Sequence, residues 1–403
     1  MKIIHYASKD QLLIPLYLPT LIFSISEGLL IPILPLYASD AGFSYAIIGI
    51  ILAGESIGML LGDIPSGILI RKIGHKYVMI FGLGLSALST LTLFWTQSFW
   101  VILLLRIIAG FGAAMFNVSR FVYLAEFAKK MIRGRASALF GGFKRIGAFI
   151  GPTIAGVIAT AYGLRVPFIL FAASLGLVMA IVANSISVND VTIPVTRKIS
   201  SPLRSNHLMS LLRYHSKILI TAGSGNFFMM MIRSVPVVII PLYSANVIGL
   251  DVQQIGFIMS LSSAIDMLLF YPAGVIMDHF GRKYAINISL LILSIGIASI
   301  PLTFSFQSIL LAAMITGAGN GIGSGTMLAL GADIAPPDIK GEFLGTWLLI
   351  GNLGSLSGPL IIGGIASVFL LSQAALTMAG LGLIGICTFL VFVPETLSKK
   401  LHV

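Results

Sequence analysis

Long, continuous runs of apolar residues constrain this chain more than any other feature. They recur twelve times, separated by short segments rich in Gly, Pro and charged residues. They lie near residues 12–38, 45–70, 77–95, 99–126, 135–160, 166–185, 216–243, 252–277, 284–303, 307–331, 342–367 and 373–394. An α-helix needs ~20 predominantly apolar residues to cross a bilayer, whereas a transmembrane β-strand alternates apolar and polar residues. The runs do not alternate, so the sequence predicts an all-α membrane protein with twelve transmembrane helices.

Composition excludes a soluble fold. Hydrophobic residues make up 57% of the 403 residues and charged residues only 10%, whereas soluble domains carry about 25% charged residues. A compact soluble chain cannot hide this many apolar side chains. We therefore expect a multi-pass protein of the cell (inner) membrane. Its one cysteine, Cys387, excludes a disulfide within the chain, and we expect it to be a small buried hydrophobe.

The distribution of Lys and Arg predicts the orientation in the membrane, because cytoplasmic loops carry an excess of these residues. Alternate loops, the central linker and both termini together hold 19 of the 25 basic residues, whereas the opposite face holds only Arg165. We therefore expect both termini in the cytoplasm. The net charge of +11 is then a topology signal, and we expect no nucleic-acid partner.

The two halves of the sequence repeat each other at a nearly constant offset. Pro35-Leu36-Tyr37 returns 206 residues later as Pro241-Leu242-Tyr243. Thereafter the offset is 207, as in Ile48-Gly49 with Ile255-Gly256, Pro65-Ser66-Gly67 with Pro272-Ala273-Gly274, Gly74 with Gly281, Gly110 with Gly317, and Gly151-Pro152 with Gly358-Pro359. Six spans return the chain to the same side of the membrane, so the halves are parallel repeats, as in one large class of transporters. We expect an N-terminal six-helix half at 1–185, a cytoplasmic linker at 186–215 and a C-terminal six-helix half at 216–403.

The loops between spans 2 and 3 and between spans 8 and 9 resemble those of a known family. The segment from Gly274 to Lys283, which contains Asp278, Gly281 and Arg282, looks like the signature loop of the major facilitator superfamily. Its first-half copy runs from Gly67 through Arg71 and Gly74 to Lys76.

Three helices extend the resemblance over the whole chain. The segment from Arg106 to Gly112 resembles the superfamily's second motif. Gly147, Gly151, Pro152 and Gly156 are similar to the motif of its proton-coupled antiporters, and Glu27 to Pro35 looks like the first helix of its drug/proton antiporters. The resemblance implies a major facilitator fold, made of two six-helix repeats, and the twelve-helix drug/proton antiporter group.

Ionisable residues inside the apolar runs are functional candidates, because each costs ~2.5–3.5 kcal/mol or more at the centre of a bilayer. The nine are Glu27, Glu55, Asp63, Arg106, Arg120, Lys144, Arg145, Arg233 and Asp266. They avoid spans 3, 6, 9 and 12, which face lipid in the fold that the resemblance implies, whereas spans 1, 4, 7 and 10 line its cavity. Helical spacing places Arg106, Asn117 and Arg120 on one face of span 4, and Asn226 and Arg233 on one face of span 7. We expect these faces to line the substrate cavity; the alternative is a polar contact between packed helices.

Glu27 is the main candidate for proton coupling. It occupies the same repeat position as Arg233, at the 206-residue offset. Burial favours the protonated form of a carboxyl group, whereas a nearby guanidinium favours the carboxylate. A carboxyl group that is protonated in one state and paired with Arg106 or Arg233 in the other would couple proton movement to transport. The alternative is a permanent structural ion pair, and Glu55 and Asp266 are second candidates for the coupled acid.

The signature loops predict a gate on the cytoplasmic side. The family's loop carries an acid where the first copy has Arg71, and the repeat equates Arg71 with Asp278 and Arg135 with Glu342. In the fold that the resemblance implies, each loop meets the first turn of a helix in the other half. The predicted pairs are thus Arg71–Glu342 and Asp278–Arg135, with the sign reversed in one of them. The alternative is a basic loop with mobile side chains that only sets the topology.

Three functions remain open. The first is a secondary active transporter that works by alternating access, in which proton-coupled antiport exports a small amphipathic organic molecule; the span 5 motif and Glu27 favour it. The second is proton-coupled uptake of an organic anion or polar metabolite, which Lys144, Arg145 and the other intramembrane bases favour. The third is a membrane sensor or partner without transport.

The sequence contains no nucleotide-binding loop, no nucleophile–base pair and no metal-ligand spacing. We therefore expect no enzymatic activity, no cofactor and no metal. The expected partners are protons, a small-molecule substrate and the lipid bilayer, and we expect a monomer.

Overall fold

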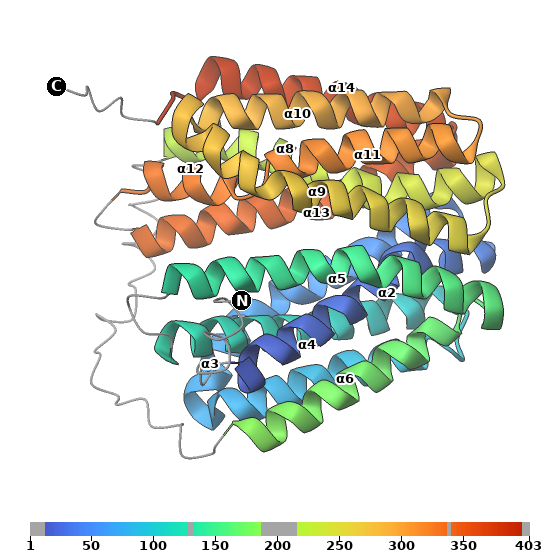
Figure 1. The fold of residues 1–403 in the computed structure, drawn as a ribbon, viewed down its shortest axis with the longest axis vertical. Helices are drawn as coiled ribbons and strands as arrows, with labels where there is room; N and C mark the ends of the chain where they lie inside the picture. The colour runs from blue at the N-terminus through green and yellow to red at the C-terminus, as the bar shows by residue number, and fades with distance from the viewer. Residues whose placement is uncertain (1–12, 128–132, 187–215, 337–339, 397–403) are drawn as a thin grey trace, which may run out of the picture. The chain divides into compact units, whose positions relative to one another are not determined.

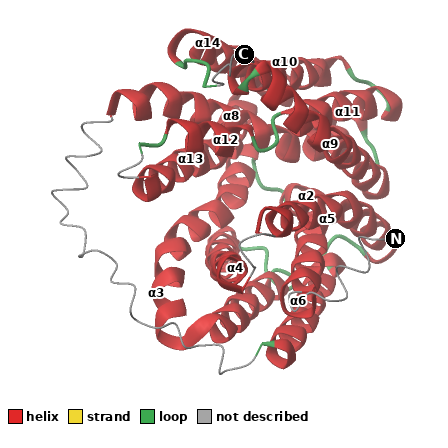
Figure 2. Cartoon of the chain, turned by 60° about the vertical axis from the view of Figure 1, so that its left-hand side comes forward, coloured by secondary structure: helices red, strands yellow, loops and turns green. Residues whose placement is uncertain are grey.

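A computed structural model describes residues 13–127, 133–186, 216–336 and 340–396 (Figure 1). The described residues form helices joined by short connections (Figure 2). The elements are the π-helix η1 (Leu13–Tyr17), α2 (Leu18–Asp40), α3 (Tyr45–Thr92), α4 (Phe99–Phe127), α5 (Arg133–Tyr162), α6 (Val166–Ser185), α8 (Ser216–Tyr243), the π-helix η3 (Ser244–Ile248), α9 (Val252–Phe280), α10 (Arg282–Ser299), the 3₁₀-helix η4 (Ile300–Leu302), α11 (Phe306–Ile322), α12 (Thr326–Ile334), α13 (Lys340–Val368) and α14 (Leu371–Phe392). Helices suit an apolar solvent because each satisfies its backbone hydrogen bonds internally.

The helices account for the twelve predicted spans. Ten helices of the described chain are long and apolar enough to cross a membrane. One of them, α3, covers both span 2 and span 3: two helices join across a kink at Gly74, which leaves helical geometry with φ 82°, so the boundary between the two spans falls inside the predicted loop. Span 10 was predicted as one helix, but it is broken into α11 and α12 by a turn in which Gly325 has φ 77°. The twelve-span prediction is therefore confirmed, and the one span that was wrongly predicted as unbroken, span 10, is interrupted at a glycine.

The chain divides into two compact units. Unit 1 comprises Met1–Ile193 with Gly249–Ser260, and unit 2 comprises Pro194–Ile248 with Leu261–Val403. Within unit 1, α3 packs against α4 and α2 packs against α5; within unit 2, α10 packs against α11 and α8 packs against α13. Most of the predicted linker at 186–215 lies outside the described residues, so that division stays a prediction.

Local geometry repeats at the offset that the sequence shows. Gly42 and Gly249 have φ 78° and 81°, and Gly74 and Gly281 have φ 82° and 103°. Side chains with a Cβ rarely adopt this region, so glycine is required at both positions of each pair. The Tyr37 hydroxyl donates to the carbonyl of Leu93 at 3.0 Å, and its repeat partner Tyr243 donates to the carbonyl of Pro301 at 3.4 Å. The two halves therefore share structure as well as sequence.

The outer surfaces of the helices are apolar, as contact with lipid requires. On α14, Leu383, Ile384, Leu390 and Val391 are 51% to 71% exposed. Cys387 on the same helix is also exposed, so the expectation that it is buried was wrong. The sequence cannot separate the two environments, because lipid tails are as apolar as a packed protein interior.

Candidate functional site

Glu27 lies on a helix that packs unusually close to its neighbour. Half-buried Glu27 is next to Gly28 on α2, and a Cβ built on Gly28 would lie 3.0 Å from the Cα of Gly151 on α5. A Cβ built on Gly147 would lie 2.6 Å from the Cβ of Ser24. Small residues on both helices let their backbones approach. The antiporter-like motif thus supplies the α5 side of the α2–α5 contact.

The rest of that motif follows the same helix. Pro152 lies inside α5 directly after Gly151. A Cβ on Gly156 would lie 2.8 Å from the carbonyl oxygen of Val252, at the start of α9 and in the same unit.

Three charged groups of unit 1 act on Glu27. The positive ones are Lys144 on α5 and Arg120 on α4, and the negative one is Glu55 on α3. Lys144 is exposed, whereas Arg120 is only 5% exposed. The guanidinium carbon of Arg120 lies 5.4 Å from the ring centre of Phe23 and 5.2 Å from that of Phe116. Glu27 therefore shares its surroundings with a buried, aromatic-lined cation.

Arg106 forms an ion pair with Glu55, which links α4 to α3. Arg106 is 2% exposed, and the Glu55 side chain is 31% exposed. Glu27 was expected to pair with Arg106 or Arg233 in one of its two states, and that expectation stays a prediction; in this structure the partner of Arg106 is Glu55. Helical spacing puts Arg106 and Arg120 on one side of α4, but the two side chains reach different neighbouring helices.

In unit 2, an amide bridges the two intramembrane charges. Asn320 on α11 donates through Nδ2 to Asp266 Oδ2 at 2.6 Å and accepts from Arg233 Nε at 2.6 Å. Arg233 also donates through an Nη to the carbonyl of Gly323 at 3.3 Å, where α11 ends. A cation is favourable there because the C-terminal end of a helix carries partial negative charge. Sequence reasoning missed Asn320, although it lies in the run from Gly319 to Gly325, whose alternate glycines signal a helix break.

Other predicted cavity residues make contacts within their units. Asn226 is 2% exposed and donates to the carbonyl of Trp347 on α13 at 2.8 Å, which is the helix–helix contact that was the alternative to cavity lining. Arg145 donates to the carbonyl of Gly141, one turn earlier on α5, at 3.2 Å. Asn117 on α4 is half-buried.

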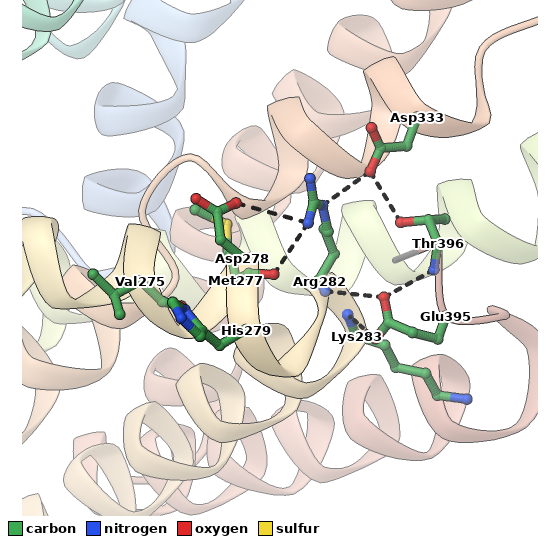
Figure 3. A network of polar contacts seen from close by, with 9 residues as sticks. All are labelled: Val275, Met277, Asp278, His279, Arg282, Lys283, Asp333, Glu395 and Thr396. Carbon is green, nitrogen blue, oxygen red and sulfur yellow. Dashed lines mark hydrogen bonds and ion pairs between the residues drawn. The ribbon is translucent and has the colours of Figure 1, made fainter. Parts of the chain in front are cut away.

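The second signature loop forms a polar network at the α9–α10 junction (Figure 3). Arg282 forms ion pairs with Asp333 on α12 at 2.9 Å and with Asp278 at 3.8 Å. Glu395, after α14, accepts from the backbone N–H groups of Arg282 at 3.0 Å and Lys283 at 3.1 Å. These are the free N–H groups of the first turn of α10, where a carboxylate is favourable.

Sequence reasoning singled out the loop residues of this network but not Asp333 on α12 or Glu395 after α14, which lie far along the chain. Lys283 adds a bond from its ammonium to the carbonyl of Leu390 at 2.8 Å. In the first copy of the loop, Gly67 has open space around it, Arg71 is exposed and His75 is 3% exposed. The ring of the buried His75 lies edge-on to that of Tyr123 on α4, with the ring centres 5.8 Å apart.

The predicted gate pairs stay predictions. The side chains of Arg135 and Glu342 lie outside the described residues, although α5 and α13 include both positions. Arg71 with Glu342, and Asp278 with Arg135, would each join unit 1 to unit 2.

A multi-pass helical protein with two repeated halves and ionisable side chains inside its spans has the design of a secondary transporter. Comparison with known proteins agrees. The profile of the Major Facilitator Superfamily matches residues 16–224 and again 222–402, and the chain belongs to this superfamily.

Three similar proteins illustrate the relationship. An MFS-type transporter of Methanocaldococcus jannaschii is 26% identical over 357 residues, which cover 88% of this chain and 90% of that protein. The quinolone resistance protein NorA of Staphylococcus aureus is 23% identical over 391 residues, covering 93% and 95%. The crystal structure of a mutant nucleoside transporter, NupG, aligns with a TM-score of 0.78 at 15% identity and covers 96% of this chain and 100% of its own. That last likeness shows the fold alone.

Proposed function

We propose that this transporter is a proton-coupled antiporter that exports a small amphipathic organic molecule. The observation that carries the proposal is Glu27, an acid inside a membrane-spanning helix whose charged neighbours include Arg120 and Lys144. Similarity to a quinolone resistance protein supports export of an organic compound. Both termini are cytoplasmic in this proposal, in keeping with the distribution of Lys and Arg.

The coupling follows from electrostatics. A deprotonated Glu27 is held by its basic neighbours, whereas a protonated Glu27 is neutral and releases them. The two protonation states therefore favour different arrangements of α2 and the helices around it, and a ligand shifts such an equilibrium only through its different affinity for the two states. Antiport results when the substrate binds better to one of these arrangements and the proton binds better to the other.

Reconstitution into proteoliposomes with an imposed pH gradient tests the proposal. The probe panel is the cationic dye ethidium, a zwitterionic quinolone and an aromatic carboxylate. We expect proton influx to drive export of at least one probe and Glu27→Gln to abolish gradient-driven export. The matched control is Asp40→Asn, which removes an exposed acid at the end of the same helix and leaves export unchanged.

Gradient-driven export that persists in Glu27→Gln would remove Glu27 from coupling. No gradient-driven flux of any probe in the wild type would contradict transport of these classes and support a non-transporting sensor or partner.

A second candidate function is proton-coupled uptake of an organic anion or polar metabolite. The nine intramembrane residues include five bases and four acids, and Asp63 among the acids is exposed. This positive excess favours a negatively charged substrate. The same panel separates the two functions, because uptake predicts accumulation of the aromatic carboxylate together with protons, while ethidium is not moved.

A further inference from the structure

Two fully buried rings hold the guanidinium of Arg120. Phe23 on α2 and Phe116 on α4 are each 1% exposed, and their ring centres are 4.6 Å apart. The guanidinium carbon lies within 5.4 Å of both ring centres. A cation is attracted to the face of an aromatic ring within about 6 Å, most strongly where water is excluded. The two rings therefore fix the position of the guanidinium as well as enclosing it.

The two rings of Phe23 and Phe116, here called the aromatic clamp, lie close to Glu27. Phe23 and Glu27 are four residues apart on α2, so their side chains occupy the same face of the helix, one turn apart. Arg120 is close enough to Glu27 for the two charges to interact. A guanidinium is charged at neutral pH, so Arg120 supplies a positive charge next to an acid that titrates.

Other charged groups around Glu27 are less suited to this role. Lys144 on α5 is exposed at the end of a flexible stem, and Glu55 on α3 is paired with Arg106. Arg145 donates to its own helix. Of the remaining neighbours of α2, the helix α6 contains no Asp, Glu, His, Lys or Arg, and η1 contributes only the phenol of Tyr17.

We propose that Arg120 is the counter-charge of Glu27, and that Phe23 and Phe116 are positioning residues that hold the guanidinium at a set distance from the carboxylate. The proposal rests on the proposed function, in which Glu27 carries the coupled proton. The clamp then sets the pH range over which the transporter loads its proton. An aromatic pair that touches neither substrate nor proton thereby tunes coupling.

Infrared titration of the reconstituted protein tests the proposal without a substrate. The C=O stretch of protonated Glu27 is identified as the band that Glu27→Gln removes, and its midpoint pH is measured. In Arg120→Gln we expect the midpoint to rise by about one pH unit, because a neighbouring positive charge favours the carboxylate. Phe116→Leu and Phe23→Leu should raise it by a smaller amount, since the guanidinium is then free to move away, whereas Phe116→Tyr keeps a ring face and the wild-type midpoint.

Phe121→Leu is the matched control. Its ring centre is also near the guanidinium carbon of Arg120, at 5.9 Å, but Phe121 is 55% exposed, so we expect no shift. An unchanged or lowered midpoint in Arg120→Gln would overturn the proposal, as would Phe23 and Phe116 variants that behave like Phe121→Leu. If the Phe116 variants do not fold, the midpoint pH is measured in Phe23→Leu and in Arg120→Lys instead. Arg120→Lys keeps the charge but loses the planar group that the rings hold, so both variants should raise the midpoint by less than Arg120→Gln does.

Failure of this proposal is separate from failure of the proposed function. If Glu27→Gln uncouples transport while the clamp variants leave the titration unchanged, only the clamp is wrong. If the clamp variants shift the titration while Glu27→Gln leaves proton-driven export intact, Glu27 is not the coupled acid.

Discussion

At the scale of single residues, this chain neutralises intramembrane charge in local groups. Glu55 pairs directly with Arg106, and Asp266 reaches Arg233 through the amide of Asn320. Such pairing is expected where water is scarce, because a lone charge inside a bilayer is costly. An acid that is already bound to a base, directly or through an amide, is poorly suited to take up and release a proton. Glu55 and Asp266 are bound in this way, which is why we propose Glu27, with Arg120 as its neighbour, as the group that carries the proton.

The Glu55–Arg106 pair should contribute to stability rather than coupling. Glu55→Gln leaves the guanidinium of Arg106 buried without its counter-charge, and we expect it to lower the free energy of unfolding by roughly 2 kcal/mol, less than for a fully buried pair because Glu55 is partly exposed. Adding Arg106→Met should restore part of the loss. Thermal unfolding of the purified variants in detergent measures both effects. A double variant no more stable than Glu55→Gln alone would show that the pair is not the source of the loss.

At the scale of elements, close helix approach and one helix break shape the two units. The α2–α5 contact depends on Gly28 facing Gly147 and Gly151. At the break between α11 and α12, the carbonyl of Gly323 accepts from Arg233 at 3.3 Å and from the hydroxyl of Thr326 at 2.7 Å. The position in the first half that corresponds to Gly323 lies inside the continuous helix α4, whereas α11 ends at Ile322. The two halves therefore differ in backbone structure at this position. Broken helices expose backbone groups at binding sites of many transporters.

Gly28→Ala should disrupt the α2–α5 contact. A Cβ at this position would overlap the carbonyl oxygen of Gly147 and lie 3.1 Å from its carbonyl carbon, so α2 and α5 must separate. We expect a loss of about 1–3 kcal/mol in the free energy of unfolding, the usual cost of overpacking. Gly142→Ala on α5 is the control, because nothing lies within 4 Å of its Cβ position. A control as destabilised as Gly28→Ala would contradict the steric explanation.

At the scale of the whole molecule, the internal repeat could be predicted from the sequence, whereas the polar contacts between distant residues could not. The apolar runs and the 207-residue offset predicted twelve spans, and Gly74 and Gly281 share a positive φ, as their matched positions require. Asn320, Asp333 and Glu395 were missed because a polar partner is chosen by three-dimensional proximity. Glu395 lies 113 residues from the N–H group of Arg282 that it accepts from, and no local pattern in the sequence marks such a contact.

The charge-swapped gate is a prediction about both units together. Glu342→Arg should reduce transport, because it would place two positive charges at the predicted Arg71–Glu342 contact, and adding Arg71→Glu should restore part of it. Such exposed pairs contribute only about 0–1 kcal/mol, yet this suffices to shift two states of nearly equal energy. Initial transport rates in proteoliposomes measure the effect. If the double variant transports no better than Glu342→Arg alone, the predicted Arg71–Glu342 pair is contradicted.

The central claim is that an organic substrate and protons move in opposite directions through Glu27. Its most direct measurement is proton flux driven by substrate alone. Proteoliposomes loaded with a transported probe and a pH-sensitive dye are diluted into probe-free buffer at equal pH. We predict that probe leaving the vesicles brings protons in, so the lumen acidifies in the wild type and stays unchanged in Glu27→Gln. Probe efflux without a lumenal pH change in the wild type, or with alkalinisation, would contradict antiport.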